Sequence, residues 1–439
     1  MDAEQPFLVA HQNALLPRLV LSENRPLRYV TFFYLYAMQG IPAGFALTAL
    51  SNYLAARGQT PQAIGSFVAL VGLPWALQFV WGPVIDRFQG SVMGRRKPWV
   101  VGSQFVAFLA SLGVLLVTDP GAELSLLTAV FCIHSVFASV QDASVDAMAI
   151  SVIPEEERGR VNAFMRGGFL LGIGLGAAVL STLLNRYGFR PAAIAQSAVL
   201  LLFTLVTCFI RERPGDSLLL NFVRRQERAP AKRGPDYSFR WLFTELLRGL
   251  FARSGFALFG AIITVYFCCS VFIRSFNIHL IQKLGWNDTE LSVLTGSYGT
   301  TVALGIIIAG GILADRIGAR RLMFWVLLLL GGFLLFFNLG LNQWSGYELA
   351  KAGLIVWSTM DPAFSVTAMP VLMAICRKGV EGSQFTTYMA LVNLSDIAGA
   401  YVAGQLLGFT SAPLIGIGCG ILVLVALLVV RLAPNNPKT

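Results

Sequence analysis

The sequence predicts an all-α integral membrane protein in which twelve transmembrane helices form two six-helix bundles around a central cavity. Composition gives the first indication, because 56% of the 439 residues are hydrophobic and 13% are charged. With a mean hydropathy of +0.67, a soluble chain could not cover its surface with so few charges. The second indication is a series of long apolar stretches. The third is a polar motif that occurs twice at matched positions.

Each apolar stretch is bounded by turn residues or charges, and each approaches or exceeds the roughly 20 residues that cross the hydrocarbon core. The predicted spans are 28–54, 62–85, 99–117, 124–152, 160–184, 190–210, 252–282, 290–313, 321–341, 347–375, 383–408 and 412–433. A large soluble helical core is the alternative, but its outer helices need polar faces, which 324–337 and 415–430 lack. The predicted parts are an N-terminal segment (1–27), a first bundle (28–211), a linker (212–250), a second bundle (251–433) and a tail (434–439).

The basic residues predict the topology. The net charge is +10, but the lysines and arginines sit in alternate loops rather than on one face. This distribution argues against a nucleic-acid partner. It is typical of loops retained on the cytoplasmic side, which also attract anionic lipid. The loops after spans two, four, six, eight and ten are basic, so we expect these loops, the linker and both termini to be cytoplasmic.

Residues typical of several other chemistries are missing from the sequence. The six cysteines lie within or at the ends of spans without metal-ligand spacing, and three histidines make a metal site unlikely to form. There is no phosphate-binding loop with the P-loop pattern and no secretory signal pattern in the first 24 residues. We find no convergent nucleophile set either. The sequence therefore predicts no cofactor, no ATP use and no enzymatic activity.

A gating motif follows span two and recurs after span eight, with its aspartates 229 residues apart. The first copy contains Gly82, Asp86, Arg87, Arg95 and Arg96, and the second contains Gly311, Asp315, Arg316, Arg320 and Arg321. Glycine allows close helix approach, and arginine satisfies the carbonyls at helix C-termini. One copy is explained equally well as a topology signal, whereas two matched copies indicate a six-plus-six repeat.

This repeated pattern resembles the major facilitator superfamily. Within it, Gln39-Gly-Ile-Pro, Gln141-Asp142-x-x-x-Asp146 and Ser383-Gln384-Phe385 look like the anhydromuropeptide permeases. The same set is similar to the acetyl-CoA transporters, and bacterial siderophore importers lie nearby. The resemblance implies rocking of two bundles around a midplane site. It also implies proton-coupled import of a small solute by a monomer in a bacterial inner membrane.

The charges within the first bundle form the first candidate site. An ionisable residue at the centre of a span costs about 2.5–3.5 kcal/mol, so it needs a partner or water. Asp142 and Asp146 share one helix face, and their mutual repulsion favours proton binding. Arg166 in span five lies at the depth of Asp146, and we expect an ion pair between them. This pair is either a static brace or a switch that frees Arg166 for an anionic solute. Gln141 lies beside the aspartates.

The second half offers a matching site. Asp361 precedes a proline in span ten, and Asp396 lies in span eleven one turn after Asn393. They are candidates for proton coupling or solute binding, and a buried pair of protonated acids is the alternative. Further candidates for solute contact are Tyr34, Gln39 and Gln384.

We therefore predict a secondary active transporter that moves a polar organic solute, such as an anhydromuropeptide, with protons. An iron-siderophore or an acyl-CoA or nucleotide-type solute is the alternative, and the same aspartates could hold Na⁺. A receptor that keeps the fold without transporting is the other class. It predicts that the intramembrane aspartates can be neutralised without loss of function.

Overall fold

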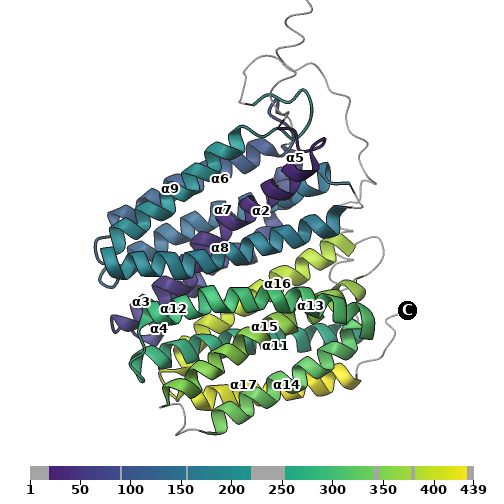
Figure 1. Cartoon of the computed structure of the whole chain (residues 1–439). Helices are drawn as coiled ribbons and strands as arrows, with labels where there is room; N and C mark the ends of the chain where they lie inside the picture. Colours follow the sequence, from purple (N-terminus) through teal and green to yellow (C-terminus); the bar gives the residue numbers. More distant parts are fainter. Residues whose placement is uncertain are drawn as a thin grey trace, which may run out of the picture.

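The computed structural model describes residues 19–88, 91–154, 157–218, 253–340, 346–376 and 381–432. Among these residues the regular structure is helical, apart from two isolated β-bridges. Nine helices within the described part of the chain are long and apolar enough to cross a membrane. Figure 1 shows the helices arranged in two groups, one from each half of the sequence. The predicted all-helical fold with two bundles is confirmed.

The first bundle contains six helical segments, several of them interrupted. They are α2 (Arg25–Gly44) continued by the π-helix η1 (Phe45–Leu50) and α3 (Ser51–Ala56); α4 (Pro61–Ala76) with η2 (Gln78–Val80) and α5 (Trp81–Arg87); α6 (Lys97–Gly113) with η3 (Val114–Leu116); α7 (Leu124–Val152); α8 (Arg158–Tyr187); and α9 (Phe189–Cys208). The sequence sets the starts of two of them, because the Asn24 and Thr60 side chains cap α2 and α4.

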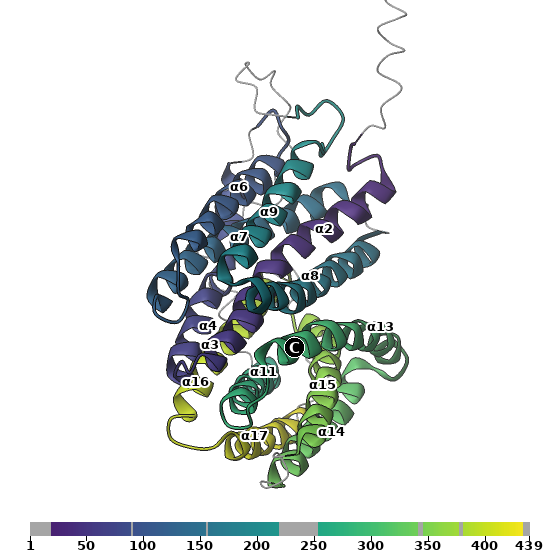
Figure 2. The ribbon, with the colours of Figure 1, turned by 60° about the vertical axis from the view of Figure 1, so that its left-hand side comes forward.

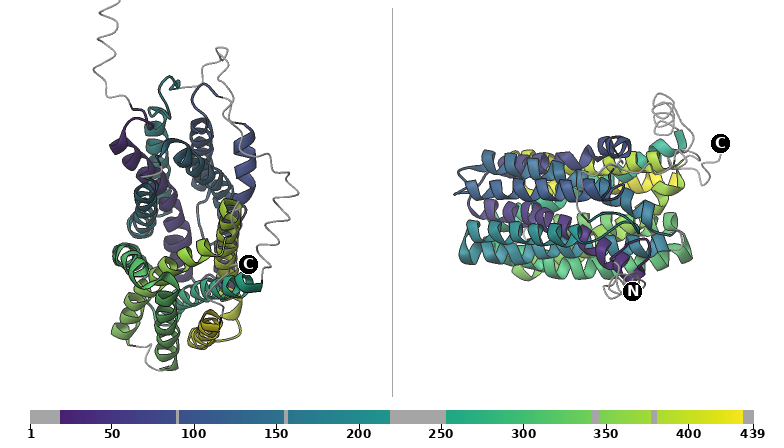
Figure 3. Two further views of the ribbon diagram at one scale, coloured as in Figure 1. Left: turned by 90° about the vertical axis from the view of Figure 1, so that its right-hand side faces the viewer. Right: turned by 90° about the horizontal axis from the view of Figure 1, so that it is seen from above.

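The second bundle repeats this plan. Its helices are α11 (Arg253–Gln282); α12 (Asp288–Val293) with the π-helix η5 (Leu294–Gly299) and α13 (Thr300–Ile317); α14 (Ala319–Leu339); α15 (Tyr347–Ala374); α16 (Glu381–Leu406); and α17 (Ala412–Leu432). Gly318 has a φ of 91° and allows the tight turn from α13 to α14. Viewed along a perpendicular direction, the helices of both bundles run roughly side by side (Figure 3).

Glycines bring α2 and α8 into close contact. A Cβ at Gly168, Gly172 or Gly176 would collide with the α2 backbone at Phe33, Ala37 or Ile41, respectively. Such small residues are how membrane helices approach closely. This packing fixes the position of α8, which carries Arg166, relative to α2.

The described hydrogen bonds between the two bundles gather towards one end of the helices. We call it the far end, because it lies opposite the linker end, where residues 209–218 leave α9. Across the far-end interface, Asn52 donates to Ser292 at 2.9 Å, Asn185 donates to Asp288 at 2.8 Å, and Gln282 donates to the Ala55 and Gln59 carbonyls. Figure 2 shows α3, α4 and α16 at this junction. Close packing of Gly65 on α4 against Gly404 on α16 reinforces it.

Candidate functional site

The two aspartates of α7 each accept a hydrogen bond from a neighbouring element. The Gln78 amide of η2 donates to Asp142, and the Tyr36 hydroxyl of α2 donates to Asp146. Asp142 is buried and Asp146 is half-buried. The i, i+4 spacing places both carboxylates on one face of α7, as predicted. Sequence reasoning did not identify Tyr36. Its span contains several aromatic residues, and the sequence alone does not show which of them points towards α7.

Arg166 lies near these carboxylates but is not in contact with Asp146. No ion pair joins the two residues, both of which the structure describes, although Arg166 acts electrostatically on Asp142 and Asp146. The predicted direct pair is therefore not formed in this conformation, where Asp146 is satisfied by Tyr36. The Arg166 side chain is exposed on α8, and it also acts on Tyr266 of the second bundle. Arg166 thus faces the interface between the bundles.

The second bundle contributes its own charged group to this interface. Tyr266 of α11 donates to Ser365 of α15 and lies within electrostatic reach of Asp361. Asp361 interacts in turn with Asp396 of α16. The Asp396 side chain is 51% exposed, so the alternative of a buried pair of acids does not hold for this residue. A role of Asp361 and Asp396 in proton coupling or solute binding stays a prediction.

Arg274 connects the two bundles. Its Nη1 donates to the Leu47 carbonyl at 2.7 Å, and its Nη2 lies 3.9 Å from the Asp396 carboxylate. Leu47 lies in the π-helix η1, where the regular i to i−4 ladder is interrupted and a carbonyl becomes available. Such interruptions often occur at functional sites. Arg274 therefore turns towards the interface between the bundles.

Several predicted solute contacts lie inside the bundles instead. Tyr34 bonds to Thr207 of α9 and stacks on Phe203. Gln39, Gln141 and Gln384 are 3%, 2% and 0% exposed, respectively. Gln141 donates to the Leu35 carbonyl, and Gln384 donates to the Tyr388 hydroxyl. All four side chains are buried in this conformation.

Asn393 is half-buried on α16, one turn before Asp396. It is the remaining candidate for solute contact, and it stays a prediction.

The structure describes the gating motif in part. Nothing lies within 4 Å of where a Cβ would be at Gly82 or Gly311, so the expected close helix approach occurs elsewhere. Arg320 donates to the Val430 carbonyl in the last turn of α17 at 2.8 Å, as expected for an arginine at a helix C-terminus. The side chains of Asp86, Arg87 and Asp315 lie outside the described residues. Arg316 and Arg321 are exposed.

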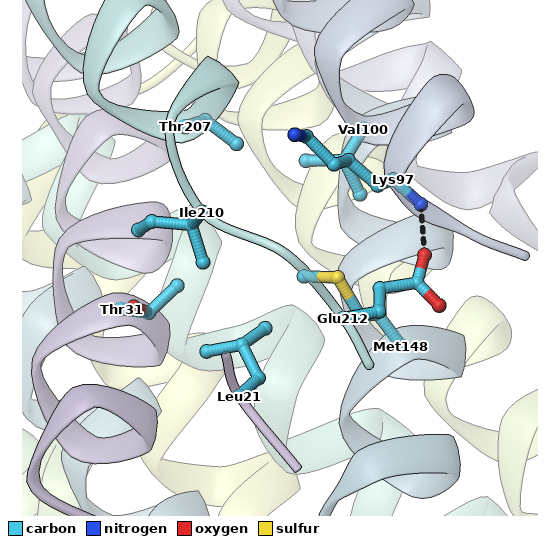
Figure 4. A pocket seen from close by; sticks show the side chains of 8 residues that line it. All are labelled: Leu21, Thr31, Lys97, Val100, Met148, Thr207, Ile210 and Glu212. Atoms are coloured by element: carbon cyan, nitrogen blue, oxygen red, sulfur yellow. Dashed lines mark hydrogen bonds between the residues drawn. The ribbon is translucent and has the colours of Figure 1, made fainter. Parts of the chain in front are cut away.

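Glu212, which sequence reasoning missed, organises the first copy of the motif. Its carboxylate accepts the backbone N–H groups of Arg95 (3.1 Å), Arg96 (2.6 Å) and Lys97. These amides form the N-terminus of α6, a natural anion site. The Lys97 ammonium donates to the Cys208 and Leu218 carbonyls. Figure 4 shows Glu212 and Lys97 at a pocket inside the first bundle. In the sequence, Glu212 could have been noticed as an acidic residue between two arginines directly after span six.

This arrangement of two helical repeats with charged groups at their interface agrees with comparison to known proteins. A model of the Major Facilitator Superfamily matches residues 30–277 and 258–439. The chain belongs to the Major Facilitator Superfamily. Solved structures of the same fold include a D-xylose-proton symporter, which aligns with a TM-score of 0.70 at 13% identity over 93% of this chain and 99% of that one.

A second solved structure is similar. It is an inward-facing bacterial homologue of the human lysosomal transporter Spinster, with a TM-score of 0.68, 14% identity, and coverage of 94% of this chain and 99% of that chain. Both likenesses concern the fold alone.

Two relatives with assigned names are a permease and a putative transporter. The anhydromuropeptide permease of Escherichia coli (strain K12) is 24% identical over 402 residues, which cover 89% of this chain and 77% of that protein. The putative transporter AmpG 4 of Rickettsia felis is 24% identical over 310 residues, 66% of this chain and 68% of that protein. Membership of a family of multi-pass solute transporters follows.

Proposed function

We propose that this protein imports an anhydromuropeptide or a closely similar solute together with protons, by alternating access in a bacterial inner membrane. The observation that carries the proposal is the group of Asp142, Asp146 and Arg166 at the bundle interface, with Tyr36 and Gln78 as donors. The permease similarity supports the choice of solute over an iron-siderophore or an acyl-CoA.

The charge balance of this group favours a proton as the coupling ion. Two carboxylates face one guanidinium, so the group carries one excess negative charge when both are ionised. A charge at the centre of a span costs about 2.5–3.5 kcal/mol, and one bound proton removes the excess. Na⁺ prefers a shell of oxygen acceptors, as hard cations do. The neighbours described here, Tyr36 and Gln78, donate hydrogen bonds instead.

The coupling follows from the same geometry. With Asp142 and Asp146 ionised, Arg166 is attracted to the first bundle. Protonation of the pair weakens that attraction and leaves the exposed guanidinium for an anionic group of the solute. Arg166 also acts on Tyr266 across the interface, so its state is transmitted to both bundles. The far end is closed here. If the linker end faces the cytoplasm, this conformation is the one that exchanges solute with the cytoplasm.

The test is uptake into proteoliposomes of labelled anhydromuropeptide, an iron-siderophore and acetyl-CoA, each with and without an inward-acid pH gradient. We expect gradient-stimulated uptake of the anhydromuropeptide, and loss of that stimulation in Asp142→Asn. Uptake of another solute would replace the substrate assignment. Uptake that ignores both the gradient and Asp142→Asn would overturn the coupling.

A non-transporting receptor remains a distinct class, and the same assay separates it. Such a protein would bind a solute without accumulating it in the lumen. Its binding would also persist when the α7 aspartates are neutralised. The repeated interface charges favour transport, because a receptor has no need to place several ionised groups where the bundles separate.

A further inference from the structure

A second pocket lies between the bundles, on the far-end side of Arg166. It is lined from the first bundle by the η1–α3 segment and α4, and from the second by α11 and α16. The polar side chains that line it are those of Ser51, Asn52, Arg274 and Asn277. Arg274 lies eight residues beyond Tyr266 on α11, which is about 12 Å at 1.5 Å per residue. The pocket is therefore separate from the Arg166 group.

Two buried polar atoms at this pocket have no hydrogen-bond partner. They are the Nε of Arg274, a donor, and the Oδ1 of Asn277, an acceptor. The other two nitrogens of Arg274 are engaged with the Leu47 carbonyl and Asp396. An unpartnered buried polar group costs about 1–3 kcal/mol. A donor and an acceptor lining one pocket are what a ligand with both functions would satisfy.

The charge at this pocket is close to balanced, because Asp396 lies 3.9 Å from the Arg274 guanidinium. A carboxylate entering the pocket would meet Asp396, and an ammonium group would meet Arg274. An apolar group would leave both buried atoms unpaired. What remains is a neutral group with an acceptor and a donor, either an amide or a hydroxyl. An amide presents the two on separate atoms, which suits two separate partners.

We propose that this pocket is a second recognition subsite that binds a neutral amide of the transported solute. The amide carbonyl accepts from Arg274 Nε–H, and the amide N–H donates to Asn277 Oδ1. This inference rests on the proposed function, because an anhydromuropeptide carries such groups both on its sugar, as acetamido groups, and along its peptide. The cavity itself is about 20 Å³, little more than the roughly 10–15 Å³ that holds one water and far below the roughly 300–1,000 Å³ of a whole small-molecule site. It therefore takes the polar edge of one small group and not the whole solute.

The test measures KM and Vmax for labelled anhydromuropeptide in proteoliposomes containing wild type, Asn277→Leu or Asn277→Ala. Loss of the acceptor is expected to raise KM about tenfold, which corresponds to about 1.4 kcal/mol, with Vmax within about twofold of wild type. The alanine variant serves if the leucine variant fails to give a monodisperse protein. An unchanged KM in every correctly folded variant would overturn the subsite.

Asn185→Leu is the matched control. Asn185 bonds Asp288 across the far end but does not line the pocket. We expect its Vmax to change while its KM stays at the wild-type value. An equal rise of KM in Asn185→Leu would mean that Asn277 acts on far-end closure, and the subsite would be rejected. If wild type takes up no anhydromuropeptide at all, the proposed function fails, and that result is distinct from failure of the subsite.

Two further solutes identify which amide is bound. A peptide-free N-acetylated anhydro-sugar and a de-N-acetylated anhydromuropeptide are used as competitors of uptake. If the acetamido group occupies the pocket, Asn277→Leu weakens competition by the N-acetylated anhydro-sugar. Competition by the de-N-acetylated anhydromuropeptide then stays unaffected. The reverse pattern assigns a peptide amide. Asn277→Asp supplies a negative charge, so with an acetamido ligand we expect it to favour the free-amine solute over its acetylated form. If every variant weakens competition by both solutes equally, the proposal is contradicted.

Discussion

The hydroxyl of Tyr36 on α2 donates a hydrogen bond to the carboxylate of Asp146 on α7. This contact ties the first helix of the bundle to the helix that carries both candidate proton sites. It also occupies the carboxylate that sequence reasoning paired with Arg166. As a result the guanidinium remains exposed at the bundle interface, where it can respond to a solute or to the second bundle.

Replacement of Tyr36 by phenylalanine tests the role of this contact. The ionised form of Asp146 would lose a charge-assisted hydrogen bond, which contributes about 1.5–3 kcal/mol. We therefore expect the pH profile of gradient-driven uptake to move to higher pH by about one unit or more. Tyr34→Phe is the matched control, because Tyr34 bonds Thr207 in the bundle interior. Its profile should match that of wild type, and equal shifts in both variants would contradict the assignment.

Glu212 should stabilise the linker end of the first bundle. Its carboxylate accepts three consecutive backbone amides, and Glu212→Ala would leave them without that partner. We expect the free energy of unfolding to fall by about 1–3 kcal/mol. The measurement is the thermal transition of the purified protein in detergent, followed by tryptophan fluorescence. Asp288→Asn at the far end is the comparison. A transition of Glu212→Ala no lower than that of wild type would show that the carboxylate is dispensable.

The α2–α8 contact predicts a position-specific effect of alanine. A Cβ at Gly172 would press on the Ala37 carbonyl and Gly40, and overpacking of this kind costs about 1–3 kcal/mol. Gly260 on α11 has nothing within 4 Å of its would-be Cβ. Gly260→Ala should therefore be neutral or stabilise the helix by about 0.5–1 kcal/mol. Both alanine variants are compared by their yield in the membrane and their thermal stability. Similar behaviour of the two variants would refute the packing argument.

The loop before α7 has a pH-dependent cap. Backbone N–H groups of Thr118 and Asp119 donate to Glu123 and hold the pKa of its carboxyl below the usual value. A lowered folded-state pKa contributes stability that is present above the unfolded value, about 4.3, and is lost as pH falls through the folded value. We expect the difference in Tm between wild type and Glu123→Gln to be constant at neutral pH and to shrink towards pH of about 3–4. A difference that is independent of pH would contradict this role.

Hydropathy and loop charge were sufficient to predict the helices and their two groups, because a span's length and its flanking charges depend on the sequence alone. The α7 aspartates followed from helical spacing. The direction of side chains on α2 could not be predicted in the same way. Tyr34 and Tyr36 lie about 200° apart around this helix, and the sequence does not show which of them faces α7. Arg166 does interact electrostatically with Asp146, but a predicted depth does not determine rotation about the helix axis, and the direct ion pair is not formed.

Two contacts depend on backbone details that no pattern indicated. The Leu47 carbonyl becomes available to Arg274 because η1 is a π-helix. Glu212 reaches the start of α6 because residues 209–218 fold back against the first bundle. Both link residues more than 100 positions apart in the sequence, and local periodicity carries no information about such pairs.

The measurement that tests the central claim most directly is solute-induced proton movement. Proteoliposomes loaded with a pH-sensitive dye would receive anhydromuropeptide outside, with wild type, Asp142→Asn and Tyr34→Phe compared at equal protein density. The account predicts acidification of the lumen with wild type and Tyr34→Phe, and none with Asp142→Asn. Solute accumulation without acidification, or acidification that persists in Asp142→Asn, would contradict proton coupling through the carboxylates of α7.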